Sequence, residues 1–136
     1  MYLDLLIAEL LESGLHVGDE LRQVTPLVTH SMAYVGPIGP NGEDVLNAPK
    51  GGVATLMHLA EVIKDGPVTI GERGPQTWAE QVSVQQRALQ ARGTPNRLVE
   101  TNCEHITHWV RTGRKKSPQL QFAVGFAVVA AIAIWG

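Results

Sequence analysis

The sequence has one cysteine and little net charge. A single cysteine among 136 residues excludes an internal disulfide framework and a zinc site built from several cysteines. Eleven Lys and Arg stand against 13 Asp and Glu, and this net charge of −2 excludes a strongly basic nucleic-acid binder that works by neutralising phosphates. A lone thiol is typical of a reducing compartment, where it can act as a nucleophile.

The remaining composition is that of a folded domain. Hydrophobic residues make up 44% of the chain and charged residues 18%, which is too apolar and too weakly charged for a disordered chain. A length of 136 residues corresponds to one domain, which can bury a useful but not a large core.

Charge is absent from the last part of the sequence. No charged residue follows Lys116, and residues 122–136 are apolar throughout. As a helix, these 15 residues would measure about 22 Å, short of the roughly 30 Å hydrocarbon core of a bilayer. Residues 117–136 would be long enough to span it if Gln119 and Gln121 lie at the interface. We therefore expect residues 1–116 to form the domain and residues 117–136 to form a hydrophobic C-terminal helix that anchors it in a membrane. The alternative is a terminal helix that packs on the domain or in a dimer.

Basic residues lie immediately before this segment, at Arg111, Arg114, Lys115 and Lys116. Such a cluster favours a cytoplasmic location for residues 1–116. Asp4 and Glu9 interrupt the apolar N-terminal stretch and no cationic region precedes it, so no signal peptide is expected there.

Hydrophobic spacing and turn residues predict the secondary structure. Apolar residues at helical spacing predict helices at residues 2–12, 56–63, 75–92 and 103–112. Alternation and turn signals predict strands at residues 20–24, 30–36, 43–47, 53–56 and 68–70. The helix at 75–92 is expected to bury Trp78, Val82 and Leu89. One helix, then three or four strands, then helices predict an α+β fold with an antiparallel sheet packed on helices.

The cysteine lies where a helix is predicted to begin. Asn102 is a good helix-capping residue, which places Cys103 in the first turn. Free backbone N–H groups and the helix dipole there favour a thiolate, and the N–H of Cys103 could stabilise an oxyanion. The alternative is a buried, inert cysteine, although a polar helix start argues against it.

A thiolate nucleophile also needs a base, and His30 is the best candidate. His105 follows Cys103 by two residues on the same helix, so it projects about 200° around the axis from the sulfur. His108 also points elsewhere, and both are expected to be structural or surface residues. His16 and His58 have no supporting sequence context.

The sequence resembles the lecithin retinol acyltransferase family in three places. Residues 102–105 (Asn-Cys-Glu-His), followed by an aromatic residue and Arg-x-Gly, resemble the cysteine box of that family. Residues 17–20 (Val-Gly-Asp-Glu) resemble its leading Gly-Asp turn, and residues 29–36 resemble its His-x-x-x-Tyr-x-Gly strand. The resemblance covers residues 17 to about 118 and implies a circularly permuted papain-like fold, in which the histidine strand precedes the cysteine helix. The hydrophobic tail extends this resemblance, since several members of the family use such a tail as a membrane anchor.

The sequence departs from this family at Asn47. The vertebrate enzymes carry a second histidine at the corresponding place on the next strand. An asparagine could instead hold the Nδ1–H of His30 through its side-chain oxygen, as in papain-like triads. The alternative is that Asn47 is a turn residue before Ala48-Pro49. The missing histidine puts lipid acyl transfer in doubt, and hydrolysis would fit equally.

Two classes of function follow from these observations. The first is a membrane-associated cysteine acyltransferase or hydrolase with Cys103, His30 and Asn47 as catalytic residues and Asn102 and Cys103 as cap and oxyanion site. Its substrate would be a lipid ester or other acyl donor, with amides in proteins or peptides left open. The second is a non-catalytic, membrane-tethered binding module on the same fold. No cofactor, metal or nucleic acid is expected in either case.

Overall fold

The computed structural model describes residues 2–24, 29–49, 51–95 and 103–114. For Tyr2, Cys103 and Glu104 it describes the backbone only. The expected cap Asn102 and the expected tail, residues 117–136, lie outside the described residues.

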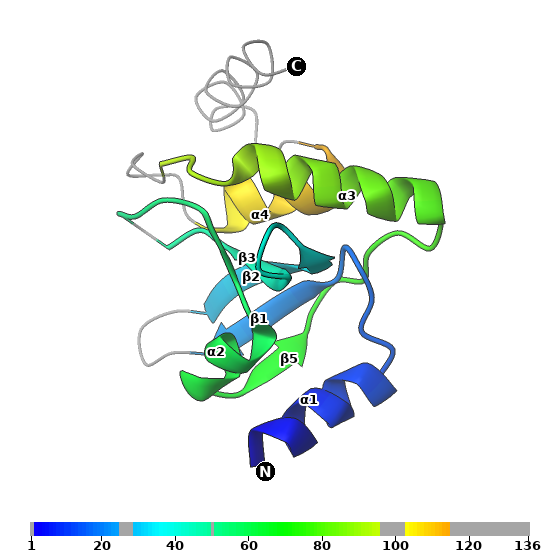
Figure 1. The fold of residues 1–136 in the computed structure, drawn as a ribbon, viewed down its shortest axis with the longest axis vertical. Helices are drawn as coiled ribbons and strands as arrows, with labels where there is room; N and C mark the ends of the chain where they lie inside the picture. The colour runs from blue at the N-terminus through cyan, green and yellow to red at the C-terminus, as the bar shows by residue number, and fades with distance from the viewer. Residues whose placement is uncertain (1, 25–28, 50, 96–102, 115–136) are drawn as a thin grey trace.

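The chain folds into a five-stranded antiparallel sheet with helices on both faces (Figure 1). In chain order the elements are α1 (Tyr2–Glu12), β1 (Glu20–Val24), β2 (Thr29–Ile38), β3 (Glu43–Asn47), β4 (Thr55–Met57), α2 (Leu59–Lys64), β5 (Val68–Ile70), α3 (Trp78–Ala91) and α4 (Cys103–Thr112). The strands lie in the order β4-β3-β2-β1-β5, so β2, which carries His30, is the central strand.

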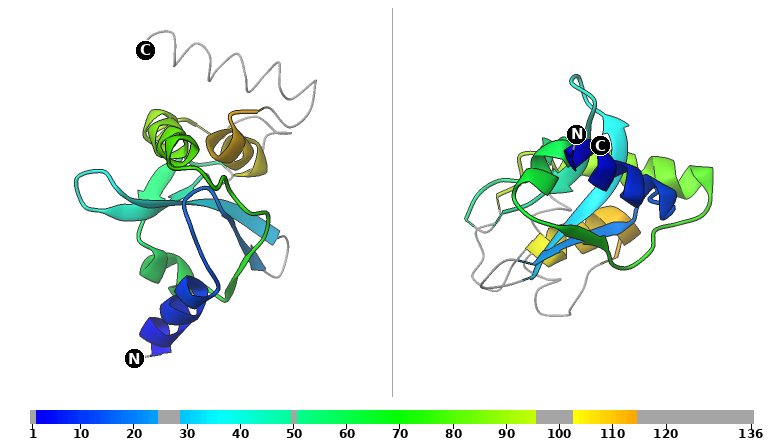
Figure 2. Two further views of the ribbon diagram at one scale, coloured as in Figure 1. Left: turned by 90° about the vertical axis from the view of Figure 1, so that its right-hand side faces the viewer. Right: turned by 90° about the horizontal axis from the view of Figure 1, so that it is seen from below.

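Two apolar clusters fill the space on either side of the sheet. Figure 2 shows α3 and α4 on one face and α2 and α1 on the other. The α3/α4 core contains Ala33, Val35 and Leu46 of the sheet, with Val84 and Val110 of the helices. The α1/α2 core contains the strand residues that alternate with these along β2 and β3, such as Met32 and Val45. Alternation along β2 and β3 therefore serves both cores, because successive strand residues point to opposite faces.

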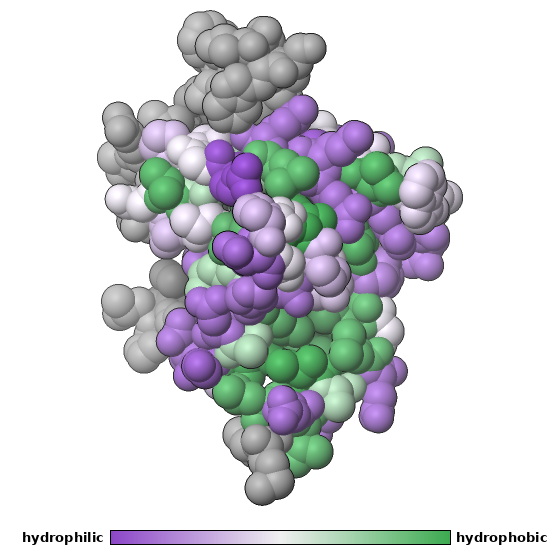
Figure 3. All heavy atoms as spheres, in the orientation of Figure 1, coloured by the Kyte–Doolittle hydropathy of each residue, from purple (hydrophilic) through white to green (hydrophobic). Residues whose placement is uncertain are grey.

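The α1 helix lies at the edge of the molecule. Leu3, Leu6 and Leu10 pack against the α1/α2 core, while Leu5 and Leu11 on the same helix are exposed. Figure 3 shows hydrophobic residues gathered over the lower part of the molecule, where Figure 1 places α1 and α2. The helix is thus amphipathic as predicted, but only part of its apolar surface packs on the core, and Leu5 and Leu11 remain exposed.

A buried polar junction joins the start of β1 to the loop before α3 and to the end of α4. The Asp19 carboxylate is fully buried and accepts hydrogen bonds from the Gly74 amide at 2.8 Å and from Arg73 Nη1 at 2.8 Å. Buried Arg111 donates from Nε to the Gly18 carbonyl at 2.7 Å. Since a buried charge is tolerated only when it is paired and hydrogen-bonded, these contacts fix how the three segments meet.

The observed elements confirm an α+β fold with an antiparallel sheet. The segments predicted at 2–12, 20–24, 43–47, 68–70 and 103–112 have these bounds in the structure. All five predicted strands are present in the sheet, although β2 covers residues 29–38 rather than 30–36 and β4 covers residues 55–57 rather than 53–56. Four strands precede α2, and the short β5 follows it and pairs with β1 at the sheet edge. Helix α2 begins at Leu59 rather than at residue 56, because the preceding residues pair with β3 and Asp44 Oδ1 accepts the Leu59 amide at 2.7 Å.

The predicted buried face of α3 was wrong. Trp78 is 80% exposed and Leu89 is also exposed, whereas Val84, Ala88 and Ala91 are the buried residues. Small side chains on this face let α3 pack beside α4 over β2. The helix begins at Trp78 rather than at Pro75, because Thr77 caps it through a hydrogen bond from the Glu80 amide to Thr77 Oγ1.

None of the helices in the described part of the chain has both the length and the hydrophobicity that a bilayer crossing needs.

A substitution at Gly18 tests the close packing at the polar junction. Its φ is +97°, and a Cβ placed there would lie 2.4 Å from Pro75 Cδ. Gly42 has a similar φ of +68° with nothing within 4 Å of its Cβ position, so it is a matched control for backbone strain alone. We expect Gly18→Ala to lower the free energy of unfolding by about 1–3 kcal/mol more than Gly42→Ala, because overpacking adds to the strain. Urea denaturation measures both, and equal losses would contradict the close approach.

Candidate functional site

His30 lies near the start of the central strand. It is the second residue of β2, is half-buried, and pairs with Gln23 of β1 in the antiparallel register. The Gln23 amide donates hydrogen bonds of 2.9 Å to the carbonyls of Val62 and Gly66, so its side chain lies on the face covered by α2. Directly opposed residues share a face of a sheet, so His30 emerges on that face with Met32.

His30 contacts Asn47 at the end of the neighbouring strand. The ring nitrogen Nε2 lies 2.5 Å from Asn47 Oδ1. Asn47 is the last residue of β3 and pairs with Thr55 of β4. Its amide nitrogen donates to Met57 Sδ at 3.4 Å. Because Nδ2 is directed to the sulfur, Oδ1 is the atom that meets the ring.

This contact fixes which ring nitrogen carries the proton. An amide oxygen only accepts hydrogen bonds, so Nε2 of His30 must be the donor. In the neutral ring, Nδ1 then carries the lone pair. The sequence indicated that Asn47 could hold Nδ1–H, but Asn47 instead approaches the ring from the Nε2 side. Asn47 is also a strand residue rather than a turn residue.

Cys103 is the first residue of α4, and its side chain lies outside the described atoms, as do Glu104's side chain and all of Asn102. The course of α4 is fixed by its later residues. Thr107 Oγ1 donates to the Ser31 carbonyl at 3.2 Å, and Arg111 reaches Gly18, whose amide donates to the Tyr34 carbonyl. The helix thus runs along β2 from Ser31 towards Tyr34, and its first turn lies at the end of β2 that carries His30.

The other histidines lie in separate environments. His16 Nε2 is 3.3 Å from Asp19 Oδ1 in the polar junction, and exposed His58 directly precedes α2. His105 and His108 are half-buried on α4. Within the described ranges, no group of three or more His, Cys, Asp or Glu side chains is placed to hold a metal ion.

Sequence reasoning missed two features that support the site. Met57 orients the Asn47 amide, and nothing in the sequence of β4 indicates this. The polar junction was also missed, although a signal was available. Asp19 and Glu20 follow a glycine, and Glu72 and Arg73 lie between two glycines, in a chain with few charges.

Comparisons of the chain with protein-family models, with curated proteins and with solved structures found no match.

The His30–Asn47 contact generates a test by proton NMR. Asn47→Ala removes the acceptor of the Nε2 proton, which should then exchange with water too fast to be observed. The lost hydrogen bond should also lower the free energy of unfolding by about 1 kcal/mol. Thr55→Ala, which changes the exposed pairing partner of Asn47, is the control and should retain the proton signal. A signal that persists in Asn47→Ala would show that Asn47 does not hold the ring.

Proposed function

We propose that the chain is a thiol enzyme in which Cys103, His30 and Asn47 transfer or hydrolyse an acyl group. The observation that carries the proposal is the contact between His30 Nε2 and Asn47 Oδ1, with the amide oriented by Met57. A histidine held at one nitrogen by an amide oxygen has its other nitrogen set as a base, which is the arrangement of a Cys-His-Asn triad. The sequence resemblance to a permuted papain-like family supports the same assignment.

In the proposed mechanism, His30 Nδ1 accepts the proton of the Cys103 thiol. The thiolate sulfur attacks the substrate carbonyl carbon, and the carbonyl electron pair moves onto oxygen. When that pair returns, the bond to the alcohol or amine breaks, and the leaving group takes the proton from Nδ1. A water molecule or a second alcohol or amine then gives its proton to Nδ1, attacks the thioester and releases the thiolate.

The start of α4 would supply the electrostatic part of this mechanism. At the first turn of a helix the backbone N–H groups have no partner in the helix, and the dipole is positive. Both favour a thiolate at Cys103 and an oxyanion beside its amide. The ten residues of α4 are anchored at the far end by Arg111, which keeps this turn in place relative to β2.

The proposal sets one geometric condition. Helix α4 packs on the face of β2 that bears Ala33 and Val35, whereas His30 emerges on the α2 face. The sulfur therefore has to meet the ring beyond the end of β2 and not across the sheet. This is possible because His30 is only the second residue of the strand.

Lipid esters are the proposed substrates, because residues 117–136 would hold the domain at a bilayer with residues 1–116 in the cytoplasm. Hydrolysis of amides is the second candidate, and the asparagine favours it. Papain-like peptidases use an asparagine in this role, and Asn47 contacts His30 here. A non-catalytic binding module would need neither the His30–Asn47 contact nor a reactive thiol.

Thiol alkylation tests the Cys103–His30 pair. We expect iodoacetamide to label the full-length protein at Cys103 at near-neutral pH, because a thiol beside a histidine ionises at a lower pH than an ordinary cysteine. His30→Ala should slow this labelling about tenfold or more, since the base is lost. His58→Ala is the control and should label like the wild type. Equal labelling rates in His30→Ala and the wild type would contradict the pair.

Turnover should be abolished by Cys103→Ala and nearly abolished by Cys103→Ser.

Deletion of residues 117–136 tests the anchor. If these residues enter a bilayer, the truncated domain should stay folded, keep its activity on a small soluble ester and lose activity on bilayer lipid. The described elements already enclose both cores, which supports this outcome. Thermal denaturation is the second measurement. A truncated protein that aggregates or loses its cooperative melt would show that the tail packs on the domain instead.

A further inference from the structure

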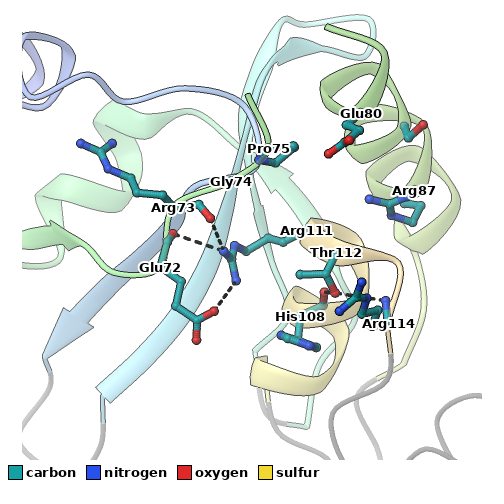
Figure 4. Close-up of a pocket in the computed structure, with 11 residues that line it drawn as sticks. Glu72, Arg73, Gly74, Pro75, Glu80, Arg87, His108, Arg111, Thr112 and Arg114 are labelled. Atoms are coloured by element: carbon teal, nitrogen blue, oxygen red, sulfur yellow. Dashed lines mark hydrogen bonds and ion pairs between the residues drawn. The ribbon is translucent and has the colours of Figure 1, made fainter. Parts of the chain in front are cut away.

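A cavity lies at the far end of α4 from Cys103. It has a volume of about 680 Å³ and is open to solvent. Figure 4 shows that residues of three segments line it: the loop before α3, one side of α3, and the C-terminal half of α4 with Arg114 after it. Its lining is rich in arginine and is separate from His30 and Asn47.

The charged side chains in this cavity do not balance. Arg73, Arg87, Arg111 and Arg114 line it, against Glu72 and Glu80. Two of the arginines are already committed to the polar junction, since Arg73 pairs with Asp19 and Arg111 donates to Gly18 and lies 3.8 Å from Glu72. The excess of positive charge therefore comes from Arg87 and Arg114, against the single carboxylate of Glu80.

Arg87 is a half-buried cation with no carboxylate partner among the described side chains. Its Nε donates to the Val110 carbonyl at 2.9 Å, which uses one of five N–H groups. Burial lowers the pKa of its guanidinium below the ordinary value. The group packs over Gly113, where an added Cβ would lie 3.2 Å from Arg87 Nη1. A partly desolvated guanidinium held in one place is a costly feature unless an anion binds it.

Arg114 supplies a second guanidinium at the rim of the same cavity. Its backbone amide donates to Thr112 Oγ1 at 3.0 Å, and that hydroxyl donates to the His108 carbonyl at 2.7 Å. These bonds order the chain just after α4, so the Arg114 side chain leaves from a fixed point. It is exposed, and no carboxylate within the described ranges pairs with it.

We propose that this cavity binds a phosphate group between Arg87 and Arg114. Two planar guanidinium forks suit the several oxygens and the double charge of a phosphate monoester. The phosphate could belong to a free anion or to a lipid headgroup, since Lys115, Lys116 and the apolar run follow directly in the sequence. The proposal stands on the cavity alone and does not depend on the chemistry at Cys103.

Backbone NMR of the full-length protein tests the site. In maltoside micelles, inorganic phosphate should shift the amides of Thr112, Gly113 and Arg114 in a saturable manner. Arg114→Gln and Arg87→Gln should each weaken this binding about tenfold, because each removes a charge-assisted pair. Arg92→Gln removes the same charge from an exposed residue that does not line the cavity, and it should bind like the wild type.

A second arm separates the two phosphate sources. The same amides are observed in nanodiscs of phosphatidylcholine alone and of phosphatidylcholine with phosphatidic acid. Shifts only with phosphatidic acid assign the site to a lipid headgroup, whereas shifts with inorganic phosphate assign it to the free anion as well. Absence of a saturable shift in both arms overturns the proposal, as does an equal loss in Arg92→Gln and Arg114→Gln. Cys103→Ala should bind normally, so failure of the proposed enzyme activity would leave this result unchanged.

Discussion

The hydrogen-bonded carboxylate of Asp19 is the constraint on which the rest of the structure depends. It lies with no exposed surface at the turn into β1 and accepts bonds from the amides of His16 and Gly74 and from Arg73. Glu20, the next residue, accepts bonds from Ser31 Oγ at 2.7 Å and from the Glu72 amide at 3.1 Å. Two adjacent acidic residues thus tie β1, β2 and the loop before α3 together.

The titration behaviour of this junction follows from the same contacts. Burial alone would raise the pKa of Glu20, but the hydrogen bonds from Ser31, the Glu72 amide and Arg22 lower it below its ordinary value. Burial lowers the pKa of Arg111, which the charges of Glu20, Glu72 and Asp19 oppose. Because the folded pKa of Glu20 is depressed, its contribution to stability is present above the unfolded pKa and is lost as the pH falls through the folded pKa. Acid therefore weakens the junction that fixes the end of α4.

The sequence predicted local structure well and the packing between distant segments less well. Glycines and prolines bound most of the short elements, so several segments had the predicted bounds. The buried face of α3 was wrong because apolar size suggested Trp78 and Leu89, whereas close packing against α4 needs the small Ala88 and Ala91. No periodicity within a helix carries that information, since it depends on which neighbour the fold supplies.

At the candidate site, too, the sequence predicted the residue involved but not its detailed contact. Asn47 was predicted as the partner of His30 from its position in a resembling motif, but the ring nitrogen that it binds was wrong. Which nitrogen is bound depends on how the His30 ring is turned towards β3, whereas the contact of the Asn47 amide nitrogen with Met57 sets only that Oδ1 meets the ring. The catalytic roles of Cys103, His30 and Asn47 remain predictions. Asn102 and the tail lie outside the described residues.

The two proposed sites lie at opposite ends of α4, and this separation limits how they could act together. A helix of ten residues is about 15 Å long. The ester carbonyls of a phospholipid are only a few bonds from its phosphate, so one lipid could not place its phosphate between Arg87 and Arg114 and its ester at Cys103. If both sites are occupied at a bilayer, they therefore hold different molecules. The cationic cavity would then orient the domain on the membrane, and the Cys103 end would take its substrate independently.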